Sequence, residues 1–414
     1  MGPAHLRRVH GLPDGRVRAV GEGPRGRTTA AARRAGGARI HRHVAGRVAR
    51  AHGDARALST DRAGFLWDPR LASHVYRADH PLKPRRLIGV HDTLEKLGAF
   101  GRPNAVVLAP RDATITEIER IHSPAYVHGV QEASADPDRD SSRWGLSAHG
   151  DTPPFAGMHE ASLLTTGGTL RGMEEVLAGR LRVAFNGAGG LHHAMRDRAS
   201  GFCIYNDPAI VCGLIADRGL KVAYVDIDAH HGDGVQAAFY DTDQVLTISL
   251  HETGRTLFPG TGFAQERGTG KGAGYSINVA LPAYTDDRAY TNAFDAVVPP
   301  LVSRFGPDVL VTQQGIDSHF TDPLTHLQVS TRAREHVVRA FRGFGLPWVA
   351  MGGGGYDLDA VARGWSIDYL VMLDAPIPDE LHDADPPAWT GDERDAIDVA
   401  TDVAVRDALA AAFT

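Results

Sequence analysis

Residues 221–234 read KVAYVDIDAHHGDG, an apolar, β-branched run that gives way abruptly to aspartates and histidines. The apolar half predicts a strand buried on both faces, which is typical of a parallel sheet covered by helices. In such sheets ligands bind beyond the carboxyl ends of the strands, so polar residues directly after a strand are candidates for chemistry. The stretch therefore predicts an α/β fold and the edge of the sheet at which its site lies.

Other short apolar runs share this character and alternate with segments of helical periodicity. The expected strands, besides Lys221–Asp226, are Ala105–Leu108, Arg182–Phe185, Val245–Leu250, Tyr275–Val279, Asp308–Gln313 and Pro347–Met351. The expected helices are His159–Leu177, Asn206–Asp217, Gly234–Phe239, Ala289–Phe305, Thr331–Phe344, Asp357–Leu373 and a last one near Asp395–Ala412. Strands that alternate with helices predict a parallel sheet covered on both faces.

A metal site is predicted from the spacing of the polar residues. Asp226, Asp228 and His230 are two residues apart, so an extended backbone points all three to one side, where a divalent cation would balance their charge. Asp317 likewise follows the expected strand Asp308–Gln313. Asp228, His230 and Asp317 would form a three-ligand site with an open position, suited to Zn²⁺ and nearly as well to Fe²⁺, Co²⁺ or Mn²⁺. A capping turn before the next helix would be the better explanation for a single aspartate. It is a poor explanation for the whole cluster.

Further polar groups follow two other expected strands. His192 and His193 stand after the glycine-rich turn of GGLHHA, and imidazole is the side chain that exchanges protons near neutral pH. Each ring needs a carboxylate on its other nitrogen, and Asp226 and Asp233 are available for that. Tyr356 follows four glycines and could donate its hydroxyl to a developing oxyanion, although simple packing of the ring is an equal alternative.

The composition is that of an ordinary globular protein, with 43% hydrophobic and 23% charged residues. No run of about 18 apolar residues occurs, which argues against a transmembrane helix. Two cysteines cannot form a disulfide framework, which favours the reducing cytoplasm. The net charge of −6 hides an asymmetry, because residues 1–62 hold 14 arginines and four acidic residues. We expect residues 1–60 to be a disordered leader, with a nucleic-acid-binding arm or a targeting segment as alternatives.

Taken in order, these motifs resemble the histone deacetylase superfamily, and in particular its bacterial acetoin-utilisation branch. Further matching segments are WDP at 67–69, HPLKPRRL at 80–87, DTPPFAGMHEAS at 151–162, GFCIYND at 201–207, FPGTG at 258–262 and GIDSHFTDPLTHL at 315–327. The resemblance implies an α/β, three-layer arginase/deacetylase-like fold with a central parallel sheet of about eight strands. It assigns residues 61–375 to the catalytic domain and residues 376–414 to a C-terminal extension that packs on it or trails from it.

The resemblance also implies a Zn²⁺-dependent enzyme, with Fe²⁺ or Co²⁺ as alternatives, that hydrolyses N-ε-acetyl-lysine on proteins and releases acetate. The implied metal ligands are Asp228, His230 and Asp317, and the implied catalytic residues are His192, His193, Asp226, Asp233 and Tyr356. The substrate tunnel would be formed by Gly201, Phe202, Phe258, Leu324 and Gly354, and Arg86 would stand in the cavity through which acetate leaves. One K⁺ or Na⁺ ion would bind at Asp226, Asp228, His230, Ser249 and Leu250, and a second at Phe239, Thr242, Val245 and Tyr275.

Some points stay open at this stage. Asp136, Asp138 and Asp140 compete to be the carboxylate with which the family grips the substrate backbone, and Gly187 stands where many relatives have proline. An amidohydrolase for acetylated polyamines is the nearest alternative function, followed by an arginase-like ureohydrolase and a non-catalytic binder of acyl-lysine. The bacterial branch suggests acetylated metabolic proteins such as acyl-CoA synthetases as substrates, and no specific nucleic-acid or membrane partner. The oligomeric state is not indicated.

Overall fold

A computed structural model of the protein describes residues 61–73 and 75–413, so the leader expected at residues 1–60 lies outside the described residues. At its centre is one sheet of eight parallel strands in the order β2-β1-β3-β8-β7-β4-β5-β6. The strands are β1 (Ala63–Leu66), β2 (Ala105–Leu108), β3 (Val183–Asn186), β4 (Val222–Asp226), β5 (Val245–Glu252), β6 (Ser276–Leu281), β7 (Val309–Gln313) and β8 (Trp348–Met351). The predicted parallel sheet is therefore confirmed, with β1 as an addition.

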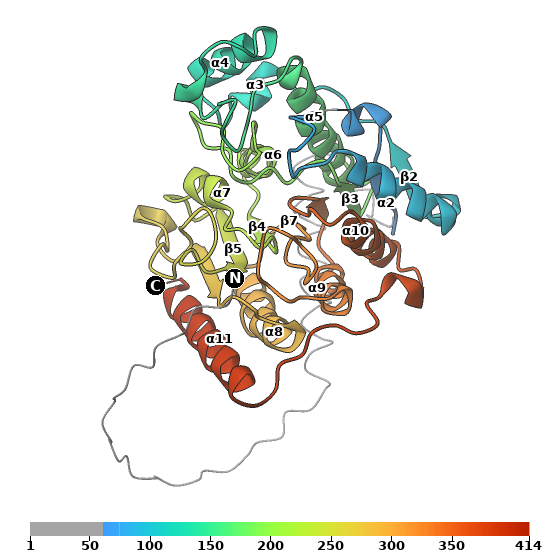
Figure 1. Cartoon of the computed structure of the whole chain (residues 1–414), viewed down its shortest axis with the longest axis vertical. Helices are drawn as coiled ribbons and strands as arrows, with labels where there is room; N and C mark the ends of the chain where they lie inside the picture. The colour runs from blue at the N-terminus through green and yellow to red at the C-terminus, as the bar shows by residue number, and fades with distance from the viewer. Residues whose placement is uncertain (1–60, 74, 414) are drawn as a thin grey trace, which may run out of the picture.

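Helices pack on both sides of this sheet (Figure 1). They are α2 (Arg85–Lys96), α3 (Ile115–Ile118), α4 (Pro124–Ala135), α5 (Met158–Leu177), α6 (Asp207–Ala216), α7 (Asp233–Ala238), α8 (Asp287–Phe305), α9 (Thr331–Gly343), α10 (Leu358–Met372) and α11 (Gly391–Ala411). Each helix predicted from the sequence overlaps one of these. The three-layer α/β arrangement follows from the alternation of strands and helices along the chain.

Consecutive residues of a central strand pack into different layers. In β4, Val222 and Tyr224 belong to a core shared with α5 and α6, whereas Ala223 and Val225 belong to a core shared with α2, α8, α9 and α10. All five residues of β4 are buried, as a strand covered on both faces requires. The chain can therefore become polar only where the strand ends, which is where the site begins.

The last helix covers one edge of the sheet. In Figure 1, α11 runs in red beside α8, and it also contacts the edge strand β6. Phe413, just after this helix, packs against Tyr275 and Phe305. Covering an edge strand in this way keeps its unpaired backbone groups from pairing with another chain.

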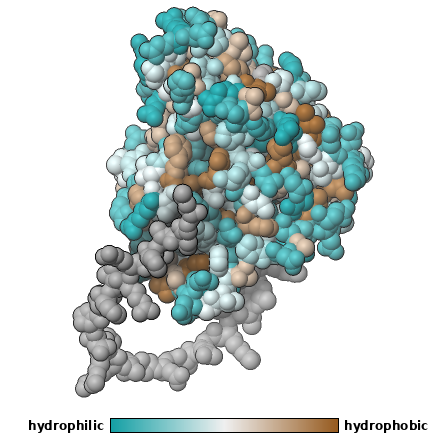
Figure 2. Space-filling model, viewed as in Figure 1, coloured by the Kyte–Doolittle hydropathy of each residue, from teal (hydrophilic) through white to brown (hydrophobic). Residues whose placement is uncertain are grey.

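The visible surface is mostly polar, with apolar residues scattered among the polar ones (Figure 2). Among the described helices, none combines the length and the apolar composition that crossing a lipid bilayer requires.

His122 makes folding stability depend on pH. Its Nδ1 donates to the Met195 carbonyl and its Nε2 accepts from the Asn206 N–H, both at 2.9 Å, so the ring must be neutral. Burial lowers the pKa of His122 to about 4, whereas a histidine in the unfolded chain has a pKa near 6.5. Between these values the unfolded chain binds a proton that the folded chain does not, so stability falls as the pH falls.

We expect this one group to remove about 2 kcal/mol from the free energy of unfolding between about pH 7 and about pH 5. Urea unfolding at the two pH values measures it. In His122→Gln, which keeps a donor and an acceptor, the loss should shrink by that amount. His128→Gln, a change at an exposed histidine, should leave the loss as in the wild type. Equal pH dependence in wild type and His122→Gln would contradict the assignment.

Candidate functional site

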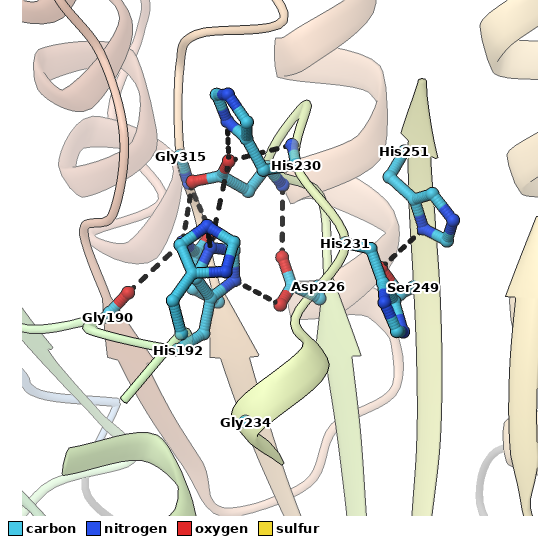
Figure 3. Close-up of polar contacts among 12 residues, drawn as sticks. Gly190, His192, Asp226, His230, His231, Gly234, Ser249, His251 and Gly315 are labelled. Atoms are coloured by element: carbon cyan, nitrogen blue, oxygen red, sulfur yellow. Dashed lines mark hydrogen bonds and ion pairs between the residues drawn. The ribbon is translucent and has the colours of Figure 1, made fainter. Parts of the chain in front are cut away.

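The polar residues predicted from the sequence meet at the carboxyl edge of the sheet. Strand β4 leads directly into Asp228 and His230, and β7 ends shortly before Asp317. Because β4 and β7 are hydrogen-bonded neighbours, the loops that follow them lie side by side. Figure 3 shows the outcome, with His192, Asp226 and His230 gathered at the ends of these strands.

Asp228, His230 and Asp317 form one compact, buried group. A ligand atom from each lies within 4.8 Å of the other two. His230 Nδ1 is 3.1 Å from Asp228 Oδ1 and 2.9 Å from Asp317 Oδ2. The remaining carboxylate oxygens accept from other groups, Asp228 Oδ2 from Gln313 Nε2 at 2.7 Å and Asp317 Oδ1 from the Ala229 N–H at 2.8 Å. These outer bonds turn one oxygen of each carboxylate toward His230.

The charge of this group suits a divalent cation. Burial, together with the nearby Asp228 carboxylate, raises the pKa of Asp317 to about 7. Burial opposes protonation of His230, but the charges of Asp317 and Asp228 outweigh it and raise the pKa of the ring. A buried group that favours a proton so strongly is stabilised equally well by a metal ion. Two carboxylate oxygens and one imidazole nitrogen fit Zn²⁺ with one coordination position open.

His192 and His193 stand beside the metal-ligating group, with their Nε2 atoms 3.0 Å apart. His192 Nδ1 lies 2.8 Å from Asp226 Oδ2, and His193 Nδ1 lies 2.7 Å from Asp233 Oδ1. Two ring nitrogens this close need a proton between them, so one ring donates and the other accepts.

The surroundings shift the pKa values of the two rings in opposite directions. Burial opposes charge on His192, but Asp226 and Asp228 outweigh it and raise its pKa to about 9. Burial and the charge of His192 lower the pKa of His193. The pair can therefore hold one proton while one ring stays basic, which is the combination that acid–base catalysis needs.

A narrow cavity reaches these groups. It is lined by both histidines, by the candidate metal ligands Asp228 and His230, and by Gly201, Phe202, Gly354, Tyr356 and Arg86. The Phe258 ring packs edge-on against His193 with ring centroids 5.1 Å apart, and Tyr356 packs in the same way on Phe202 at 5.8 Å. Leu324 lies outside the lining of this cavity.

A second cavity, of about 80 Å³, adjoins the first and shares Leu82, Arg86, Leu191 and Phe202 with it. The guanidinium of Arg86 is buried between the two, where it donates to the Gly355 carbonyl at 2.9 Å and lies over the Trp365 ring. Burial lowers the pKa of Arg86, while the surrounding carboxylates and Tyr356 favour its charge. The buried cation makes this junction a suitable passage for an anion.

The carboxylate at the mouth of the cavity is one that sequence reasoning missed. Asp151, an exposed residue, accepts from the Gly201 N–H at 3.0 Å. The side chain of the next residue, Thr152, accepts from the Phe202 N–H at 3.1 Å. Of the expected candidates, Asp140 is engaged with Ser142 in its own loop. These contacts favour Asp151 as the candidate for the carboxylate that grips the substrate backbone. The sequence signal available for it was its place in the DTPPFAGMHEAS motif.

The backbone of the histidine pair is held by two further residues that sequence reasoning did not single out. Asp207, at the start of α6, is fully buried and accepts from the N–H groups of Gly190 and Leu191 at 3.1 and 2.9 Å. Asn206 donates to the His192 carbonyl at 3.1 Å. Their adjacency in GFCIYND was the only available signal, since their partners lie in another loop.

The residues expected to bind monovalent cations are partly brought together. Ser249 is paired with Asp226 across β4 and β5, and its Oγ lies 2.8 Å from His251 Nδ1. In the second group, the Thr242 N–H donates to the Phe239 carbonyl at 3.4 Å. Both cation sites stay predictions.

The fold and the site define an α/β enzyme that combines a three-ligand metal group with a histidine pair. Residues 80–371 match the histone deacetylase domain. The chain is 41% identical over 334 residues to the acetoin utilization protein AcuC of Bacillus subtilis. The aligned residues cover 78% of this chain and 84% of that protein. It is 34% identical over 319 residues to AcuC of Staphylococcus xylosus, covering 75% and 82%. It is also 34% identical over 319 residues to histone deacetylase 1 of Homo sapiens, covering 77% and 66%. The chain therefore belongs to the histone deacetylase family.

The metal-ligating group predicts one tightly bound Zn²⁺ per chain. Binding to the folded state alone should raise the melting temperature, and Asp317→Asn should abolish both the binding and the rise. Calorimetric titration with Zn²⁺ and thermal unfolding measure the two effects. His91→Ala is the matched control, because His91, Asp92 and Glu95 form the other candidate group among the described residues, at the surface. Unchanged stoichiometry in Asp317→Asn would refute the ligand assignment.

Proposed function

We propose that this protein is a Zn²⁺-dependent deacetylase that hydrolyses N-ε-acetyl-lysine on proteins and releases acetate. The observation that carries the proposal is the histidine pair, each ring backed by its own carboxylate, beside three metal-ligating side chains. The acetoin utilization proteins and the human histone deacetylase found as relatives support it. The narrow cavity suits a slender aliphatic chain such as that of lysine.

When bound, the metal ion polarises the amide carbonyl and lowers the pKa of the attacking water. The histidine pair handles the protons of this reaction. His193, whose pKa is lowered, is the ring that stays neutral and accepts the proton of the water. The protonated pair then supplies the proton that the departing lysine amine needs. Asp226 and Asp233 hold the two rings in place and stabilise their charged forms.

Other residues bind the substrate and stabilise the oxyanion. Tyr356 donates its hydroxyl to the carbonyl oxygen as negative charge develops there. Phe202 and Phe258 exclude water from the lysine chain, and Gly201 and Gly354 line the narrow cavity that receives it. Asp151 accepts from backbone N–H groups of the substrate at the cavity mouth, and Arg86 attracts the acetate product.

The proposal extends to the surroundings of the site. K⁺ or Na⁺ binds at the two groups of residues expected from the sequence and stabilises the loops around β4 and β5. Residues 61–375 form the catalytic domain, and residues 376–414 form an extension whose helix α11 contacts α8 and β6. The substrates are acetylated proteins of the cytoplasm, with acyl-CoA synthetases as the first class to test.

A deacetylation assay on acetyl-lysine peptides tests the reaction class. We expect release of acetate that a chelator abolishes and Zn²⁺ restores, and loss of turnover in His193→Ala because the proton acceptor is gone. Acetylputrescine is the comparison substrate and should be turned over less well than the peptide. A strong preference for acetylputrescine would identify an acetylpolyamine amidohydrolase instead.

Tyr356→Phe tests the oxyanion donor. Removing one such hydrogen bond should lower kcat by about 10²–10³-fold, because the bond forms fully only in the transition state. Steady-state kinetics with the same peptide measures the change, and Tyr284→Phe, at an exposed tyrosine, serves as the matched control. Full activity in Tyr356→Phe would remove this residue from the mechanism.

A further inference from the structure

The segment Asp322–His326, DPLTH, contacts several parts of the site at once. Thr325 Oγ1 donates to the backbone carbonyl of Asp317. His326 Nδ1 lies 2.9 Å from the buried carboxylate of Glu252, at the end of β5. Asp322 is bound to the loop that carries Tyr356. The segment thus connects the candidate metal ligand Asp317, the loop after β5 and the tyrosine loop, although the proposed reaction gives Asp322 no role.

Asp322 is the member of this segment that acts on the tyrosine. Its side chain is 8% exposed. Oδ2 accepts from the Tyr356 N–H at 2.9 Å, and Oδ1 accepts from the Leu324 N–H, also at 2.9 Å. One carboxylate therefore joins the backbone of the tyrosine to the backbone of the segment Asp322–His326. Bonds to a charged acceptor are stronger than bonds between neutral groups.

The sequence before Tyr356 explains why such a bond is needed. Residues 352–355 are glycines, which have no side chains to pack and restrict the backbone least. The course of this loop is therefore set by hydrogen bonds to its backbone and by close contacts of neighbouring groups with the glycines. The Gly354 N–H donates to Asp228 Oδ2 at 2.8 Å and the Gly355 carbonyl accepts from Arg86. Asp322 supplies the corresponding bond at Tyr356 itself.

We propose that Asp322 is a positioning residue that fixes the backbone of Tyr356 and thereby aims its hydroxyl at the substrate carbonyl. The proposal rests on the role proposed above for Tyr356. A preorganised oxyanion donor has to be held within about 0.5 Å of its productive position. A loop of four glycines has no side chains of its own that would hold it there. Asp322 acts only through the tyrosine and does not touch substrate.

The test is a double-mutant cycle. Asp322→Asn keeps the shape but leaves one uncharged oxygen for two backbone donors, so the bond to the Tyr356 N–H is either lost or weakened. We expect kcat for an acetyl-lysine peptide to fall by about 10- to 100-fold with KM within about twofold. In the Tyr356→Phe background the same substitution should change kcat by less than about threefold, because the hydroxyl that it positions is already gone. Zn²⁺ affinity should stay within about threefold of the wild type in both backgrounds.

The controls separate this role from general damage. Asp295→Asn, the same change at an exposed carboxylate on α8, should leave kcat unchanged. If Asp322→Asn does not fold, Asp322→Ser takes its place in the cycle.

Four results would overturn the proposal. An equal loss of kcat in both backgrounds, or a loss that follows reduced Zn²⁺ binding, would show a merely structural role. Full kcat in Asp322→Asn with an inactive Tyr356→Phe would defeat this inference alone, whereas an active Tyr356→Phe would defeat the oxyanion role and the inference together.

Discussion

Buried negative charge is the constraint on which this site depends. Asp226, Asp228 and Asp317 are each at most 1% exposed, and all lie at the ends of two adjacent strands. A carboxylate out of water is stable only when hydrogen-bonded or paired. Asp226 is paired with His192, and the other two face His230 and accept from neighbouring donors. This negative charge is therefore balanced by the histidines, Gln313 and the loop N–H groups. A divalent cation would complete the balance.

The parts of the structure that could be predicted are those that local sequence determines. Seven strands and the ligand spacing follow from apolar runs and a period of two, both properties of the backbone. Strand β1 was not expected because Gly64 interrupts its apolar run, and that glycine is required by its close contact with Leu181. Asp151 and Asp322 were missed because neither directly follows an expected strand, and their partners are backbone N–H groups 50 and 34 residues away that carry no sequence signal. Only the folded chain brings those groups together.

The division of the carboxylates also bears on the class of reaction. An arginase-like ureohydrolase needs two metal ions and hence further bridging carboxylates near the first group. In this chain Asp226 and Asp233 are bound to the histidine rings, so neither is free to bridge. Within the described residues, the buried site offers a single three-ligand group. A binder of acyl-lysine would need no proton-transfer pair, and burying two histidines and their carboxylates without that use would be unfavourable.

The same buried charge accounts for the glycines of the motifs. Four buried carboxylates each have a glycine so close that an added Cβ would lie within 2.5 Å of a carboxylate oxygen. The pairs are Gly232 with Asp226, Gly315 with Asp228, Gly354 with Asp317 and Gly189 with Asp207. Such distances are impossible for a real side chain, so each glycine is required by the carboxylate beside it. The GGGGY stretch is therefore closely packed against the carboxylates and the neighbouring backbone, and because its glycines have no side chains, the bond from Asp322 to the Tyr356 N–H comes from elsewhere in the fold.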